Sequence, residues 1–344
     1  MFCTRYRLTR QTNADGRIYG TWDFKWPQGT TIRVAFKDWV GGLNNANLDG
    51  IEFTSSDPAE TKLVDGAPTR YGRLTRIVEC LARRWLMKEA NIRFAFDHPD
   101  DDQILDADAY DVLVSLAPLP ISQSLEVLTP VTPKTPNGTK LIEKKYFLPG
   151  SELGRYAQRV DYNVPTTYLG KREHLAGSLA EYFSSPEFQH WVIHEFGHVL
   201  GLPHEQQNPN INQRIKLKDK DKLVGLLRTA LGYPEEAVQD ITAAEVEEEI
   251  IQPWPTLPGA PYCDFRSYGQ GDPIDDTTSV MFHLFWERLL VGGADDAPAR
   301  YHQRPTDRDL DNLGVMYPPR LAARAVASAR PTGMVPPTPP PPAP

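Results

Sequence analysis

The chain has few cysteines, no long apolar run and no surplus of basic residues. Its 344 residues include only Cys3, Cys80 and Cys263, an odd number at wide spacing. This excludes a disulfide framework and a C-x-x-C metal site, and it favours a reducing compartment. Cys80 falls among apolar residues at helical spacing, so we expect it to be buried in the core.

The absence of apolar segments limits the locations open to the protein. No run approaches the roughly 18 residues that a transmembrane helix requires, and the first residues, M-F-C-T-R-Y-R-L-T-R-Q-T-N, lack the apolar core of a secretory signal. We therefore expect a soluble protein that is cytoplasmic or exported by a leaderless route. Acidic residues outnumber basic ones by 45 to 37, which argues against nucleic acid or a membrane surface as a partner.

One short segment, by contrast, contains three histidines. It begins at His194 and reads H-E-F-G-H-V-L-G-L-P-H-E. His194 and His198 lie four residues apart, which puts both imidazoles on one face of an α-helix. Gly201 allows the helix to end and Pro203 discourages its continuation, so His204 can approach the same metal ion from the side. Three protein ligands leave one position open, as in catalytic zinc sites.

The helix that contains these histidines has two possible starts. Ser184 with Glu187 fits a capping box, whereas Ser185 as the cap would place Pro186 at the first helical position. An apolar stripe lies opposite the histidines, which predicts a helix with one face in the core and the other presenting the metal. The residues of the stripe are Val192, Phe196 and Val199, flanked by Ile193 and Leu200.

The full pattern H-E-x-x-H-x-x-G-x-x-H resembles the zinc signature of the metzincin metallopeptidases. Glu205, directly after the third histidine, makes the segment most similar to the astacin family. The resemblance implies an α+β, two-lobed fold with a twisted mixed sheet, a backing helix, the zinc helix and a smaller, irregular or helical C-terminal lobe. It also implies that Glu195 is the general base, and that the residue at the place of Glu205 pairs with the amino terminus of the mature enzyme. Because residues 1–28 lack the F-x-G-D motif of an inhibitory propeptide, we expect Glu205 to be buried and paired instead with a side chain such as an arginine.

Metzincins also have a methionine turn beneath the zinc. Met281, in the sequence S-V-M, is the best match, and Met316 is its rival. Astacin-like enzymes usually place a tyrosine two residues after this methionine, where the present chain has His283. We interpret His283 as a catalytic residue that donates a hydrogen bond to the oxyanion, with metal ligation and a structural role as open alternatives.

Periodicity outlines the rest of the fold. Helical spacing covers residues 70–90, and a helix capped by Thr306 covers 305–317, while residues 40–68 are rich in turn formers and predict a long loop. A strand, a helix and two further strands indicate a sheet with a crossover helix. Strands are predicted at 30–37, 92–97, 110–116 and 165–170, with edge strands near 141–148 and 157–163.

These elements divide the chain into three parts. Residues 1–28 are an N-terminal extension or short propeptide, and residues 321–344 are an Ala- and Pro-rich tail. The catalytic domain spans 29–320, with an upper lobe at 29–201 and a lower lobe at 202–320.

Together, the patterns predict a monomeric zinc-dependent endopeptidase. His194, His198 and His204 bind Zn²⁺, Glu195 moves the proton of an activated water, and the substrate is a peptide or protein that lies extended along an edge strand. Two other functions remain open. One is a zinc hydrolase of the same fold acting on a non-peptide amide, and the other is a zinc-binding module that has lost catalysis.

Overall fold

The computed structural model describes the parts of the chain that surround the histidine segment. The described residues are 25–37, 43, 47–98, 110–118, 150–151, 154, 165–171, 176–202, 204–205, 218–219, 222–223, 225–226, 279–282, 288, 290–292, 294 and 298–319, together with the backbone of 11–12, 18–19, 125–129 and 140–144. Of the predictions above, His283, the strand at 157–163 and the tail lie outside these residues.

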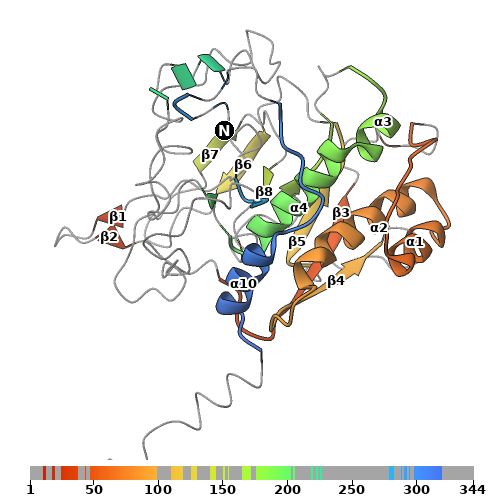
Figure 1. The fold of residues 1–344 in the computed structure, drawn as a ribbon, viewed down its shortest axis with the longest axis horizontal. Helices are drawn as coiled ribbons and strands as arrows, with labels where there is room; N and C mark the ends of the chain where they lie inside the picture. Colours follow the sequence, from red (N-terminus) through yellow and green to blue (C-terminus); the bar gives the residue numbers. More distant parts are fainter. Residues whose placement is uncertain are drawn as a thin grey trace, which may run out of the picture.

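The centre of the fold is a five-stranded mixed sheet in the order β4-β3-β5-β9-β8 (Figure 1). Its strands are β3 (Thr31–Lys37), β4 (Arg93–Asp97), β5 (Val112–Ser115), β8 (Gly150–Ser151) and β9 (Thr167–Tyr168). The first four in the order are parallel, and β8 pairs antiparallel with β9 at the edge. The four principal strand predictions are confirmed, and β5 is buried at every position, as its apolar sequence indicates.

Two short antiparallel pairs lie outside this sheet. Strand β1 (Gln11–Thr12) pairs with β2 (Ile18–Tyr19), and β6 (Leu125–Thr129) pairs with β7 (Lys140–Lys144). The edge strand predicted near 141–148 therefore overlaps β7, but β7 pairs with β6 and not with the central sheet.

The crossover from β3 to β4 runs through helix α2 (Arg70–Arg83) and the short 3-10 helix η1 (Arg84–Leu86). The helical prediction for 70–90 is confirmed up to Leu86, and residues 87–90 are not helical. Cys80 of α2 is 2% exposed, and burial raises the pKa of its thiol to about 12, so it is an inert core residue.

The prediction of a loop throughout 40–68 was wrong, because helix α1 (Pro58–Asp65) lies within it. Asp57 caps this helix by accepting a hydrogen bond from the Ala59 N–H, and Pro58 occupies the first turn. Both are ordinary helix-start signals that the surrounding Gly, Asn and Asp residues obscured in the sequence.

The histidine segment forms helix α4 (Pro186–Val199), which follows helix α3 (Leu179–Ser184). Of the two possible starts, Ser185 is the cap, since its hydroxyl accepts from the Phe188 N–H at 3.1 Å. Ser184 instead ends α3. Its hydroxyl donates to the Ala180 carbonyl and accepts from the Glu52 N–H, so it is not available to cap α4.

Helix α4 is buried on all sides from Phe188 onward, so the face that carries the histidines lies inside the protein as well. Every residue from Phe188 to Val199 is buried. Phe196 packs on Phe94 and Phe96 of β4, with ring centroids 5.5 and 5.9 Å away, as the apolar stripe predicts. The histidine face is covered as well, because the segment 279–282 packs against it through contacts described below.

Two residues far apart in the sequence, Trp26 and Tyr317, bond the C-terminal end of α4. The Trp26 indole N–H donates to the Val199 carbonyl at 2.7 Å, and the Tyr317 hydroxyl donates to the Leu200 carbonyl at 2.7 Å. These donors satisfy carbonyls that a helix end leaves without an intrahelical partner. Trp26 is 1% exposed and belongs to the core, although it falls within the segment 1–28 that the sequence suggests is an extension.

Helix α10 (Asp307–Met316) precedes Tyr317 and lies beside this end of α4 in Figure 1. Thr306 and Asp309 form its capping box, which confirms the predicted start. Met316 is buried within this helix, so it is not the methionine of a turn. Among the described residues, no helix has the length and apolarity needed to cross a membrane.

Candidate metal centre

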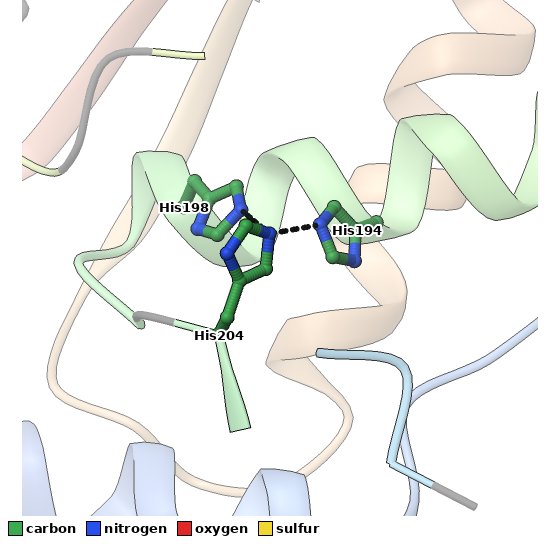
Figure 2. A group of neighbouring side chains, drawn as sticks. All are labelled: His194, His198 and His204. Atoms are coloured by element: carbon green, nitrogen blue, oxygen red, sulfur yellow. Dashed lines mark hydrogen bonds between the residues drawn. The ribbon is translucent and has the colours of Figure 1, made fainter. Parts of the chain in front are cut away.

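Local backbone geometry brings the third histidine back to the other two. Helix α4 presents His194 and His198 one turn apart, and the chain then reverses at Gly201, whose φ of 95° is a left-handed value that suits glycine. The Leu202 N–H bonds the Gly197 carbonyl at 2.9 Å, which closes the helix end. His204 follows three residues after Gly201 and faces the other two histidines, as the sequence spacing predicts (Figure 2).

The three Nε2 atoms lie at the spacing that a tetrahedral metal requires. The His204 Nε2 is 3.3 Å from the Nε2 of His194 and 3.3 Å from that of His198, as the dashed lines in Figure 2 indicate. Ligands about 2.0–2.1 Å from a tetrahedral zinc ion are roughly 3.3–3.4 Å from one another. The residues present therefore fit a metal ion bound by three imidazoles.

Hydrogen bonds fix the tautomers of two of the rings. The His194 Nδ1 lies 2.7 Å from the Val280 carbonyl oxygen, and the His198 Nδ1 lies 2.7 Å from that of Leu202. A carbonyl only accepts, so each Nδ1 carries the proton and each Nε2 lone pair points at the shared centre. This is the arrangement that metal-binding histidines have, with the second nitrogen held by an outer partner.

Burial favours the neutral form of these rings. It lowers the pKa of His194 to about 4, an effect that the bond to Val280 partly opposes and the charge of His302 reinforces. Burial, followed by the charge of His194, also lowers the pKa of His198 well below its ordinary value. Both imidazoles are therefore unprotonated near neutral pH, the form that binds a metal ion.

Met281 lies directly against the helix that bears the histidines. A Cβ atom added to Gly197, between His194 and His198 in the sequence, would overlap the Met281 sulfur and come within 2.8 Å of the Trp85 ring. Met281 is 2% exposed, and it fills the space that the glycine leaves. The structure thus places the methionine of the S-V-M sequence at the metal centre.

The predicted acidic residues are also buried here. Glu195 follows the first histidine on α4 and is 0% exposed. Glu205 is 5% exposed, as expected, and its backbone N–H donates to the Met281 carbonyl at 3.0 Å, which ties the His204 segment to the methionine turn. An arginine partner for the Glu205 side chain remains a prediction.

The sequence reasoning missed another histidine beside the centre. His190 is 1% exposed, its ring stacks on that of His194 with centroids 5.7 Å apart, and its Nδ1 accepts from the His302 N–H at 3.1 Å. These contacts fasten the segment around Tyr301 and His302 to helix α4. The four-residue spacing of His190, His194 and His198 was a signal that could have identified it.

Comparison with known proteins identifies no family for this chain. No family model matches the sequence, and no curated protein matches it. Two solved structures of myroilysin are similar to this chain. The first is 18% identical, with a TM-score of 0.46 over 86% of this chain and 97% of that one, and the second is 19% identical, with a TM-score of 0.41 over 88% and 89%. At such values the function has to follow from the site itself.

Proposed function

We propose that this protein is a zinc-dependent endopeptidase of the metzincin type, most similar to the astacins. The observation that supports this best is the convergence of three histidines, with the His204 Nε2 3.3 Å from the Nε2 of both His194 and His198 and with Glu195 on the same helix as these two. The H-E-x-x-H-x-x-G-x-x-H sequence and the methionine against Gly197 agree with the same assignment.

The ligand set favours zinc. Imidazole nitrogens suit zinc, copper, iron and nickel, while hard cations such as Mg²⁺ and Ca²⁺ prefer oxygen ligands. Three protein ligands in tetrahedral geometry leave a fourth position for water or substrate, the pattern of catalytic zinc sites. The metal would be held by His194, His198 and His204.

A zinc ion bound there supplies a Lewis acid that activates water and polarises the scissile carbonyl. Glu195 would accept the proton of the attacking water and transfer it to the leaving amine. The bonds from the His194 and His198 Nδ1 atoms hold both rings still during this transfer.

The sheet offers a place for an extended peptide. Strand β8 is the edge strand next to β9, it runs antiparallel to its neighbour, and it contacts helix α4. A peptide that adds to this edge would pair through its backbone and lie along the zinc helix. We propose β8 as the substrate strand and His283 as an oxyanion donor, which its position two residues after Met281 supports.

Two measurements test the proposal. The purified protein should contain about one zinc per chain, and it should cleave a proteome-derived peptide library in a manner that a chelator abolishes and zinc restores. Glu195→Gln should keep the zinc and lose about 10²-fold or more of kcat, the contribution of a general acid–base residue.

Glu187→Gln is the matched control, because Glu187 lies in the first turn of the same helix, where its carboxylate accepts from the Trp191 indole N–H at 3.5 Å. It should keep full activity. Wild-type activity in Glu195→Gln would refute the assigned role of Glu195, and a wild-type protein without zinc would refute the metal centre.

A further inference from the structure

A continuous chain of hydrogen bonds leads from His194 to a carboxylate on helix α10. The His194 Nδ1–H donates to the Val280 carbonyl at 2.7 Å. The other end of that same peptide group is the Met281 N–H, which donates to the Ser279 hydroxyl at 3.1 Å. The Ser279 hydroxyl in turn donates to the Asp309 Oδ1 at 2.5 Å. Imidazole, peptide, hydroxyl and carboxylate are thus connected in series.

Every donor in this series points toward the carboxylate, which makes the direction unambiguous. A carbonyl cannot donate, so the proton between His194 and Val280 belongs to the imidazole. The Ser279 hydroxyl accepts from the Met281 N–H, and its own proton is then directed at Asp309. The 2.5 Å length of that last bond lies at the short end of the range for a hydroxyl that donates to a carboxyl oxygen.

Asp309 is well placed to anchor the series. It is 3% exposed, and its second oxygen accepts from the Val280 N–H at 3.2 Å and from the Thr306 N–H at 2.9 Å. The carboxylate therefore receives three donors, two of them from the turn at 279–280. Met281, the next residue of this turn, accepts a hydrogen bond from the Glu205 N–H through its carbonyl oxygen. The turn is therefore bonded both to His194 and to the segment that carries His204.

We propose that Asp309 is a positioning residue of the metal centre, acting on His194 through Ser279 and the Val280–Met281 peptide. This inference rests on the proposed zinc site. Metal-binding histidines commonly donate to a carboxylate directly, which fixes the tautomer and raises the basicity of the ligating nitrogen. Here the carboxylate would do so across one hydroxyl and one peptide group, because hydrogen bonds in series polarise one another.

The alternative is that Asp309 only caps helix α10. It does belong to the capping box, and its own N–H bonds the Thr306 hydroxyl at 3.1 Å. A residue with that role alone would affect the folding of α10 and leave the zinc affinity of the folded protein unchanged. The zinc dissociation constant therefore separates the two interpretations, whereas a melting temperature does not.

The experiment compares four variants of the full chain in two matched pairs. Ser279→Ala breaks the hydrogen-bond chain, while Thr306→Ala removes the helix cap and leaves the chain intact. Asp309→Asn removes the carboxylate, while Asp307→Asn removes a carboxylate of the same helical turn whose side chain is 92% exposed. Each variant is titrated with zinc against a chromophoric chelator, and its thermal unfolding is measured with the metal removed.

Ser279→Ala and Asp309→Asn should each weaken zinc binding by about 10- to 100-fold, the usual effect of losing an outer partner of a ligating histidine. A fifth variant that combines Ser279→Ala with Asp309→Asn should bind zinc no more weakly than the worse single variant, since both changes break the same chain. Thr306→Ala and Asp307→Asn should bind zinc like the wild type, even if Thr306→Ala melts earlier.

Equal zinc affinity in all four variants, with a wild type that does bind zinc, would overturn the role of Asp309 and leave the metal centre standing. A wild type that binds no zinc would overturn both. If Asp309→Asn does not fold, Ser279→Ala and ¹⁵N NMR of its histidine rings decide the question. An unchanged chemical shift of the His194 Nδ1–H in Ser279→Ala, together with unchanged zinc affinity, would contradict the inference.

Discussion

Gly197 and Met281 are in direct contact, because a Cβ atom at Gly197 would lie only 2.3 Å from the Met281 sulfur. This contact joins helix α4 to the turn that holds His194, and the Trp85 ring closes the same space, 2.8 Å from that Cβ position. The glycine between the two histidines is therefore required by packing, in addition to the chemistry of its neighbours.

Gly197→Ala should lower the stability of the protein by about 1–3 kcal/mol, the usual cost of overpacking a core. Thermal unfolding of the zinc-free protein measures this. Gly314→Ala is the control, since Gly314 lies in helix α10 with no atom within 4 Å of its added Cβ, and alanine should there be neutral or stabilising. An unchanged melting temperature in Gly197→Ala would contradict the contact.

Trp26→Phe should destabilise the protein, although the indole lies near the start of the described chain. The change removes the N–H that donates to the Val199 carbonyl and leaves a buried acceptor without its partner, at a cost of about 1–3 kcal/mol. Urea unfolding measures the loss. Tyr317→Phe, which removes the bond to Leu200, should have a similar effect. Wild-type stability in both variants would mean that these bonds do not hold the helix end.

The zinc-free protein should lose stability as the pH falls from about 6.5 toward 4. Burial places the pKa of His194 at about 4, below its ordinary value of 6.5, so in this range the unfolded chain binds more protons than the folded one. Stability present above pH 6.5 is then lost on acidification, by on the order of 3 kcal/mol for this one ring. Denaturant unfolding of chelated protein at several pH values measures the loss.

The same titration on His194→Gln supplies the control, because a glutamine at this position does not titrate. Its stability should depend less steeply on pH between 6.5 and 4. If the variant and the wild type show equal slopes, the His194 ring is not the group that takes up the proton.

His283→Phe tests the residue two positions after Met281. If His283 donates to the oxyanion, kcat should fall by about 10²–10³-fold with the zinc content unchanged, as when one oxyanion donor is removed. The measurement is kcat across pH together with metal analysis. Loss of zinc would make His283 a ligand, and an unchanged kcat would leave it a structural role.

Sequence alone was sufficient for features that depend on the backbone of one element. The spacing of His194 and His198, the helix end at Gly201 and the cap at Thr306 were predicted and are present, because each follows from helical geometry within a few residues. The strands of the parallel sheet were readable for the same reason, through their apolar and β-branched residues.

Only the tertiary structure decided which groups hold the histidines in place. The Val280 carbonyl that fixes His194 is 86 residues away in the sequence, and Asp309 is 30 residues beyond Ser279. No local pattern encodes such a pairing, since a backbone carbonyl is present at every residue and only packing selects one. The burial of the histidine face and the contact of Met281 with Gly197 were likewise decided by the segments that fold over helix α4.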